Sequence, residues 1–173
     1  IKVVAMIENL NIILEQAKVE DASSILNLQK KAYQTEAEIY QDWNIPPLNQ
    51  TLDELKGEFK DQCILKAVMN TEKNYLKIVG SVRAIEEGDV IQIGRLMVDP
   101  EFQGLGIGKK LLDAIERIYP ERRLELFTGH LSLDNLRLYQ KLGYVFFKEK
   151  QIHQNLKFIY LYKLSAYKDS QTL

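Results

Sequence analysis

The chain has 173 residues, of which 46% are hydrophobic and 27% are charged, a composition typical of one globular domain with a buried core. Its 23 basic and 24 acidic residues give a formal net charge of -1, which gives little support to a nucleic-acid-binding domain or to a surface that binds anionic membranes. Cys63 is the only cysteine, so an internal disulfide is excluded, and with only His130 and His153 beside it we expect no structural metal.

No internal repeat or flexible linker divides the chain, so we expect a single domain over residues 6–173. Met6 is a candidate natural start, which would make residues 1–5 added or upstream sequence. No apolar run is long enough to span a membrane, and the opening stretch is too short and polar for a signal peptide. We therefore expect a cytoplasmic protein.

The first third of the chain predicts one strand and two helices. Residues 11–18 ("NIILEQAK") partly alternate and predict a strand, and apolar residues at helical spacing predict a helix over residues 19–33. Thr51 and Glu54 have the spacing of a capping box, which predicts a second helix running to about Asp61. The aromatic, proline-stiffened residues 34–50 connect the two helices.

The rest of the chain alternates between strand and helix patterns. Apolar runs at residues 63–69, 77–86 and 90–98 predict an antiparallel meander, and Gly94 within the third run predicts a bulge or a close approach of ligand. A helical apolar face from residue 107 to Pro120 follows, then a strand at 123–129, a helix from Ser132 to Gly143, and strands at 144–150 and 158–164. This order predicts a mixed α/β sheet with helices on its faces.

The segment "VDPEFQGLGIGKKLLDAIE" (residues 98–116) contains the most informative pattern. Gly104, Gly106 and Gly108 alternate where a strand gives way to a helix, so unpaired backbone amides can approach a diphosphate without interference from a Cβ. Lys109 and Lys110 add positive charge. The spacing fits neither a Walker A loop nor a dinucleotide-binding fingerprint. A flexible turn that carries no ligand is the alternative.

Two stretches resemble the GNAT superfamily of acyl-CoA-dependent N-acyltransferases. Gln103, Gly106 and Gly108 fit its motif A pattern, Gln/Arg-x-x-Gly-x-Gly/Ala, and "LRLYQKLGYVFF" (residues 136–147) resembles its motif B. The resemblance implies a mixed, mostly antiparallel sheet of six to seven strands flanked by about four helices. It also implies a splay between the strands that end near Val98 and Thr128.

The same resemblance implies acetyl-CoA as co-substrate. Met97 and Val98 would pair their main chain with the pantetheine arm, and Ser132 or Asn135 would replace the asparagine that motif B commonly carries. The alternatives are that Ser132 is a helix N-cap and that Asn135 is a solvated helix residue. The diphosphate would be bound by backbone amides of Gln103, Gly104, Leu105, Gly106, Ile107, Gly108 and Lys109.

Tyr139 occupies the motif B tyrosine position, at which the family often uses the hydroxyl as general acid to the CoA sulfur. An amphipathic core tyrosine is the alternative, and both readings can hold together. The strand of motif A offers no carboxylate, so the candidate bases are Glu86 and His130. A charged hairpin tip and an ordered loop histidine are the corresponding structural alternatives.

The implied activity is transfer of an acetyl group to a primary amine of a small molecule (a polyamine, amino sugar or amino acid) or of a protein. The connection between the first two helices would form the acceptor pocket, and its Glu36, Glu38 and Asp42 favour a cationic acceptor. The predicted walls of this pocket are Tyr33, Tyr40, Trp43, Ile45 and Pro46. A non-catalytic acyl-CoA-binding module on the same fold is the alternative, because the strand carboxylate is missing. The resemblance also allows a homodimer.

Overall fold

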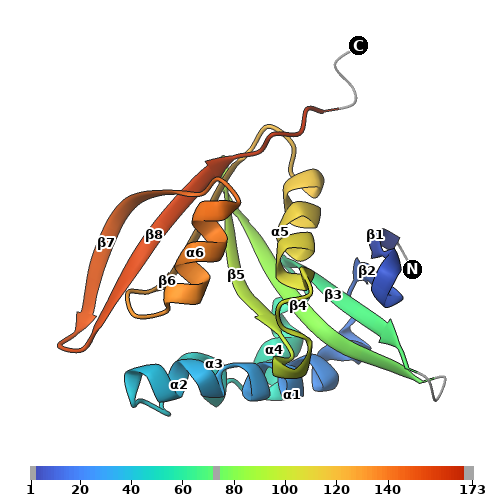
Figure 1. The fold of residues 1–173 in the computed structure, drawn as a ribbon, viewed down its shortest axis with the longest axis horizontal. Helices are drawn as coiled ribbons and strands as arrows, with labels where there is room; N and C mark the ends of the chain where they lie inside the picture. Colours follow the sequence, from blue (N-terminus) through green and yellow to red (C-terminus); the bar gives the residue numbers. More distant parts are fainter. Residues whose placement is uncertain (1–2, 72–74, 170–173) are drawn as a thin grey trace.

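The computed structural model describes residues 3–71 and 75–169 (Figure 1). The strands in these residues are Val3–Ile7 (β1), Ile12–Gln16 (β2), Gln62–Asn70 (β3), Leu76–Glu87 (β4), Val90–Val98 (β5), Arg123–Gly129 (β6), Val145–His153 (β7) and Leu156–Leu164 (β8). The α-helices are Ala22–Ala32 (α1), Gln34–Tyr40 (α2), Pro46–Asn49 (α3), Leu52–Glu58 (α4), Ile107–Ile118 (α5) and Leu133–Lys141 (α6). Short 3-10 helices are formed by Glu8–Leu10 (η1), Val19–Asp21 (η2) and Pro100–Phe102 (η3).

One sheet contains all eight strands of the described residues, in the order β1-β2-β3-β4-β5-β6-β8-β7. Every neighbouring pair is antiparallel except β5 and β6, which are parallel. The predicted mixed α/β class is confirmed, but the expected count of six to seven strands is one too low. The additional strand is β1, which pairs with β2 and lies mostly before residue 6, the start of the expected domain.

The connection between the first two predicted helices is itself partly helical. Gln34–Tyr40 forms α2, which ends at Gln41 in the left-handed conformation, and Pro46 provides the fixed φ that suits the first turn of α3. The expectation of about four helices is therefore low by these two short helices. The capping box at the start of α4 is confirmed, because Thr51 Oγ1 accepts from the Glu54 amide and the Glu54 carboxylate accepts from the Thr51 amide.

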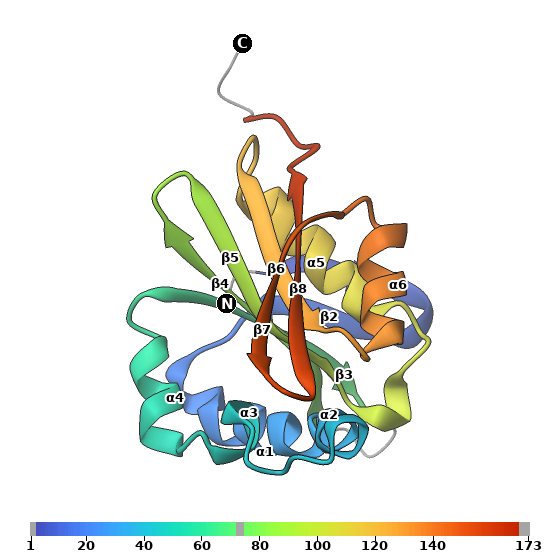
Figure 2. The same ribbon diagram turned by 90° about the vertical axis from the view of Figure 1, so that its left-hand side faces the viewer.

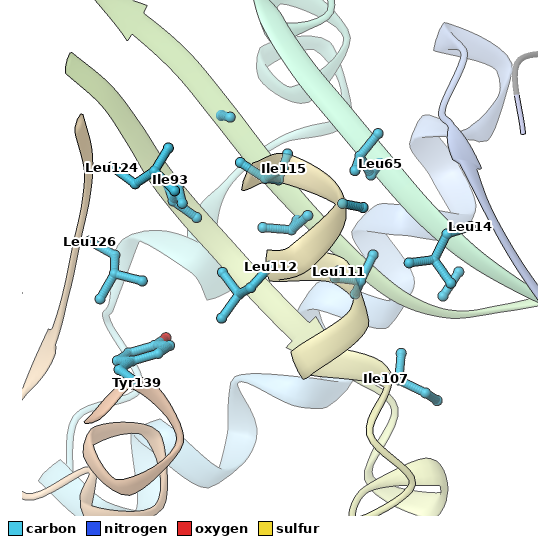
Figure 3. Close-up of a cluster of buried hydrophobic side chains, with 14 of the residues drawn as sticks. Leu14, Leu65, Ile93, Ile107, Leu111, Leu112, Ile115, Leu124, Leu126 and Tyr139 are labelled. Carbon is cyan, nitrogen blue, oxygen red and sulfur yellow. The ribbon is translucent and has the colours of Figure 1, made fainter. Parts of the chain in front are cut away.

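The helices cover opposite faces of the sheet. In Figure 2, α1, α2, α3 and α4 gather at the bottom of the view, whereas α5 and α6 lie at the right. Val82 and Ala84 of β4 join the apolar cluster beneath α5, and Arg83 between them faces α1 and α4, as the alternation of a strand requires. Figure 3 shows Leu111, Leu112 and Ile115 of α5 inside this apolar cluster.

The sheet opens between β5 and β6. Their ladder runs only from Val90 to Gln92 on β5 and from Arg123 to Glu125 on β6, although both strands continue further. Strand β6 instead stays paired with β8 as far as Gly129. The predicted splay is therefore present, and it leaves one edge of β5 without a ladder partner near Val98. No helix of the described residues is long and apolar enough to cross a membrane.

Candidate active site

The glycine loop follows β5 and leads into α5. Gly104 has a φ of 77° and Gly106 a φ of 81°, left-handed values that favour glycine, and Gly106 is the N-cap of α5. A Cβ added at either position would meet no atom within 4 Å. The open space and the unpaired amides at the start of α5 are the two properties that a diphosphate site needs.

The predicted loop residues divide into two groups. Gln103, Gly104, Leu105, Gly106 and Lys109 are exposed around the open space, so both backbone and charge are accessible there. Ile107 is 1% exposed and packs in the core, so only its backbone can contribute. Gly108 lies in the helix with an ordinary φ, and an added Cβ would make a normal van der Waals contact with Leu138 at 3.7 Å, so neither its backbone nor its packing requires glycine.

Met97 and Val98 lie at the end of β5, directly before the loop. On one side they pair with Ser81 and Gly80 of β4, and on the other side β6 has already diverged. The Met97 side chain is buried beneath α1. The main chain of β5 thus offers unpaired donors and acceptors in strand geometry beside the glycine loop.

Tyr139 projects from α6 into the core beneath α5, where Figure 3 shows it beside Leu126. The residue is 6% exposed, and its hydroxyl makes no hydrogen bond with another described residue. Burial raises the pKa of Tyr139, and the neighbouring Tyr33 and Glu36 raise it further. The hydroxyl is therefore protonated at neutral pH and can donate. The core and general-acid readings are compatible in this position.

Ser132 and Asn135 are both engaged by Glu36 of α2. Ser132 Oγ donates to Glu36 at 2.7 Å and Asn135 Nδ2 donates to the other carboxylate oxygen at 3.3 Å and to Thr128 Oγ1 at 3.2 Å. Ser132 stands at the N-cap position of α6, but its side chain makes no capping bond. Neither alternative therefore holds: Ser132 does not cap α6, and Asn135 is not simply solvated.

Tyr40 of α2 fixes the same junction. The Leu131 amide donates to the Tyr40 hydroxyl at 2.9 Å, and because Ser132 gives its own proton to Glu36, Tyr40 donates to Ser132 Oγ at 2.9 Å. A Cβ on Gly129 would lie 2.0 Å from the Tyr40 hydroxyl oxygen. The close docking of α2 on the segment before α6 thus requires glycine at position 129.

The two candidate bases lie in different parts of the sheet. His130 follows β6 at the open end of the splay, with its ring centroid 6.0 Å from that of Tyr40. Its Nδ1 accepts from the Lys157 amide at 3.1 Å, which places the proton of the neutral ring on Nε2. Glu86 pairs with Arg122 at 3.2 Å near the start of β5. Nearly the whole length of β5 separates Glu86 from the glycine loop.

A polar cluster beneath α1 and α4 was missed by sequence reasoning. Arg83 is 3% exposed and donates to Gln29, to Gln50 at 3.2 Å and to Glu58 at 2.7 Å. These residues come from four different helices, strands or connections, so no spacing within one segment of the sequence predicts that they lie together. A single charge in the middle of the apolar run "KIVGSVRAIE" was the available signal, because a charge there is expected only if it is paired.

A cavity of about 300 Å³ lies beside this cluster, lined by Pro46, Asn49, Gln50, Glu54 and Arg95. Of the residues predicted to wall an acceptor pocket, Pro46 lines this cavity and Tyr33 lies against Arg95, whereas Trp43 is 51% exposed. No group of three or more His, Cys, Asp and Glu side chains in the described part of the chain is arranged to hold a metal ion.

Residues 23–144 match the family model described as "Acetyltransferase (GNAT) family". The curated protein named "Uncharacterized N-acetyltransferase ycf52" from Porphyra purpurea is 24% identical over 99 residues, which is 57% of this chain and 57% of that protein. The match thus spans little more than half the length of this curated relative.

Two solved structures share the fold. The ribosomal L7/L12 alpha-N-protein acetyltransferase RimL, in complex with coenzyme A, aligns with a TM-score of 0.69 and 13% identity over 94% of this chain and 98% of its own. The spermidine N-acetyltransferase of Vibrio cholerae, in complex with CoA and spermine, aligns with a TM-score of 0.67 and 16% identity over 91% and 97%. At these identities the likeness concerns the fold.

Proposed function

Because the chain belongs to the GNAT acetyltransferase family, we propose that it is an N-acetyltransferase that moves an acetyl group from acetyl-CoA to a primary amine. The observation that supports this most strongly is the open loop at Gly104 and Gly106, placed where β5 separates from β6. The similar structures named above act on a ribosomal protein and on spermidine by their names, so the amine belongs either to a protein or to a small molecule.

The residues present fit a CoA diphosphate and pantetheine arm. The loop is open around Gly104 and Gly106, where the amides that begin α5 are accessible, and the Lys109 side chain adds a positive charge. The free edge of β5 at Met97 and Val98 suits the peptide-like pantetheine. Ser132 and Asn135 act indirectly in this proposal, because their side chains hold Glu36.

The acetyl thioester supplies an activated carbonyl carbon. A neutral amine attacks this carbon, so that a C–N bond forms and the C–S bond breaks; the nitrogen loses one proton and the departing thiolate takes one up. Tyr139 donates the proton to the sulfur, since its buried hydroxyl is protonated and has no other partner among the described residues. We assign the removal of the amine proton to Glu36, acting directly or through a water molecule.

The assignment of Glu36 rests on its position. It is the carboxylate that faces the junction of α2 and α6, and its charge contributes to the raised pKa of Tyr139. His130 uses Nδ1 to accept from the Lys157 amide, so its remaining nitrogen carries the proton and cannot accept another. Glu86 lies at the other end of β5 beside Arg122.

Binding of acetyl-CoA is tested by calorimetric titration of the parent and of Gly106→Glu, which places a carboxylate in the proposed diphosphate seat. Gly88→Glu is the matched control, because Gly88 also has a left-handed φ, 61°, and also faces open space, at a hairpin tip away from the loop. We expect the Gly106 variant to lose binding and the Gly88 variant to keep it. Absence of binding by the folded parent would contradict the proposed function.

Turnover is tested by release of CoA in the presence of an amine. Tyr139→Phe is expected to lower kcat by about 100-fold or more, the usual effect of losing a general acid. Tyr144→Phe is its control, since Tyr144 is also buried in the core and its hydroxyl lacks a described partner. Tight binding of acetyl-CoA without turnover for any amine would instead indicate a non-catalytic binding module.

The edge strand β7 offers a surface through which two copies of the chain could associate. Val145 is 56% exposed and Phe146 is 51% exposed at the start of this strand, at the end of the sheet. An exposed apolar edge suits pairing with a second copy, and we include a homodimer in the proposal. Light scattering of Phe146→Lys and of the parent tests it, with a monomeric parent as the contrary result.

A further inference from the structure

Arg95 occupies an unusual backbone position on β5. Ser81 of β4 pairs with Met97 and Arg83 pairs with Gly94, so Arg95 and Leu96 together stand opposite Val82 alone. This is a β-bulge, and it follows Gly94 directly. Arg95 has a φ of 49°, a left-handed value that is unfavourable for a residue with a side chain. A strained arginine in a bulge indicates that the fold directs this side chain to a particular place.

The bulge moves Arg95 to the other face of the sheet. Ile91 and Ile93 lie in the cluster beneath α5, so an uninterrupted strand would point residue 95 into the same apolar core. With the bulge, Leu96 takes the α5 side, and Arg95 lines the cavity of about 300 Å³ beside α3 and α4. This cavity is open to solvent, and its volume lies at the lower end of the range for small-molecule sites.

The charge of Arg95 is not balanced within the described chain. Its Nε is buried without a hydrogen-bond partner, and no described carboxylate forms an ion pair with its guanidinium. Arg83, nearby, already pairs with Glu58; burial lowers the pKa of Arg83, and the charge of Arg95 lowers it further. Glu58 is thus already engaged, and Arg95 brings to the cavity wall a positive charge that no described carboxylate neutralises through an ion pair.

Negative charge lies on two other sides. Glu54 also lines the cavity, but its carboxylate accepts from the Thr51 amide at 2.7 Å and completes the cap of α4. Glu36, which holds Ser132 and Asn135, is close enough to both Tyr33 and Tyr139 for its charge to raise the pKa of each. Burial is the main cause of the raised pKa of Tyr33. The charge of Arg95 lowers this pKa and the charge of Glu36 raises it, so both charges act electrostatically on Tyr33. The Arg95 guanidinium lies 5.9 Å from that ring.

Strand β5 connects the cavity with the proposed pantetheine edge. Arg95 precedes Met97 by two residues, about 7 Å along a strand. A small molecule whose anionic end is bound at Arg95 would extend along Tyr33 toward Glu36 and Tyr139. An amine at its other end would then meet the base and the general acid of the proposed mechanism.

We propose that Arg95 binds the carboxylate of the acceptor, and that the acceptor is a small amino acid-like molecule carrying both a carboxylate and the primary amine that is acetylated. This inference rests on the proposed acetyl transfer. It also revises the expectation of a purely cationic acceptor, because Glu36 is engaged inside the site and the cavity itself presents arginine. Planar guanidinium and carboxylate groups match in bidentate geometry.

The test uses pairs of amines that differ only in the α-carboxylate. Each of the protein amino acids, and ornithine, is compared with its decarboxylated amine. Examples are ornithine with putrescine and lysine with cadaverine. Rates of CoA release from acetyl-CoA give kcat/KM for both members of each pair. For the accepted pair we expect a preference of about 30-fold or more for the carboxylate-bearing member, as for a buried charge pair. Equal rates, or preference for the amine without a carboxylate, would overturn the inference.

Arg95→Gln is expected to abolish that preference, mainly through a higher KM for the amino acid, and to change the rate with its decarboxylated partner little. Arg95→Gly serves as the second variant, because glycine adopts the left-handed φ without strain and the fold is retained. Arg117→Gln is the control, since Arg117 is an exposed residue of α5 paired with Asp113. Preference retained in both Arg95 variants would show that another group binds the carboxylate.

The two proposals fail in different ways. If acetyl-CoA binds and only amines without a carboxylate, such as spermidine or a peptide N-terminus, are acetylated, the inference about Arg95 is wrong and the acetyl transfer stands. If acetyl-CoA binds and no amine of either kind is acetylated, the proposed activity is wrong. Calorimetric titration of the CoA-loaded parent and Arg95→Gln with the preferred amino acid gives a readout independent of turnover, and only the parent is expected to bind.

Discussion

The two faces of the sheet are built in different ways. Beneath α5 the described residues form a cluster of 19 buried hydrophobic residues, including Leu111 and Ile115, which are both 0% exposed. Beneath α1 and α4 the corresponding cluster has eight, and Gln29 and Arg83 are buried close to it. One face is an apolar core that sets the position of the glycine loop. The other combines a smaller core with polar groups around a cavity.

Because they are built differently, the two faces have different physical roles. A close-packed apolar face holds α5 rigidly, and a rigid helix start keeps its amides in a fixed place for an anion. A polar face stabilises less, because burial of charged groups is costly, but it distinguishes ligands by charge and hydrogen bonding. We expect substitutions of apolar residues beneath α5 to act mainly on stability, and substitutions of the polar residues beneath α1 and α4 to act on specificity, on stability or on both.

The largest effect is expected for Leu111→Ala. Leu111 is fully buried beneath α5, where it lies against Gly80 of β4, so its truncation leaves a cavity in the apolar face. The free energy of unfolding should fall by about 4 kcal/mol, as measured by urea denaturation. Leu164→Ala is the control, because Leu164 is 65% exposed and its truncation should have little effect. A loss below about 1 kcal/mol would contradict the contrast between the faces.

The face beneath α5 is also the part that the sequence predicts well. The apolar spacing from Ile107 to Ile118, the glycines before it and the tyrosine of motif B are all local patterns, and each predicts an element or a position directly. Gly94 predicts the bulge of β5 in the same way. Local patterns of this kind depend on neighbours a few residues away, which a single sequence displays.

The face beneath α1 depends on contacts between distant residues. Glu36 meets Ser132 across 96 positions of the chain, and Arg83 meets Gln29 across 54. Serine at a helix start and asparagine within a helix have good local explanations, and those explanations do not anticipate the carboxylate that α2 brings. The helices α2 and α3 were missed for a similar reason, because their short segments are stabilised by docking rather than by their own pattern.

The second prediction concerns the buried ion pair of the polar face. Glu58→Gln removes the negative charge that pairs with buried Arg83, and the guanidinium is then left with neutral amide oxygens as its only acceptors, those of Gln29, Gln50 and the substituted side chain. The free energy of unfolding should fall by about 3 kcal/mol, the lower end for a broken buried pair, because 25% of the Glu58 side chain is exposed.

Glu149→Gln is the matched control for this change. Glu149 pairs with Lys157 at 3.1 Å, but both side chains are substantially exposed, so its removal should cost less than about 1 kcal/mol. Urea denaturation of both variants and the parent provides the comparison. Equal losses would show that Arg83 is solvated well enough to do without Glu58.

The third prediction separates strain from function at the cavity. Arg95→Gly relieves a left-handed φ and removes a buried Nε that lacks a described partner, so we expect the free energy of unfolding to rise by about 1 kcal/mol. Gln41→Gly relieves a similar φ, 51°, at an exposed helix end and controls for the backbone term alone. A marked loss of stability in the Arg95 variant would mean that this side chain holds the fold together.

The smallest effect is expected at Asp99, which ties the end of β5 to α1. Its carboxylate is paired with Lys31 at 2.8 Å and with Lys77 at 3.2 Å. Burial alone would raise the pKa of Asp99, but hydrogen bonds from Lys31, the Glu101 amide and Lys77 outweigh it and lower the pKa. The charged form is therefore bound more favourably in the folded state than in the unfolded state.

The sign of the pH dependence follows from this lowered pKa. The stabilisation by Asp99 is fully present above the unfolded pKa of an aspartate, about 3.9, and is lost as pH falls through the lower folded value. Asp99→Asn should cost about 1 kcal/mol at neutral pH, and the difference from the parent should shrink below about pH 4. Asp134→Asn, at a 98% exposed side chain, should show no such convergence. A difference that stays constant down to pH 2 would mean that the loss comes from packing rather than from the ion pairs between α1 and β5.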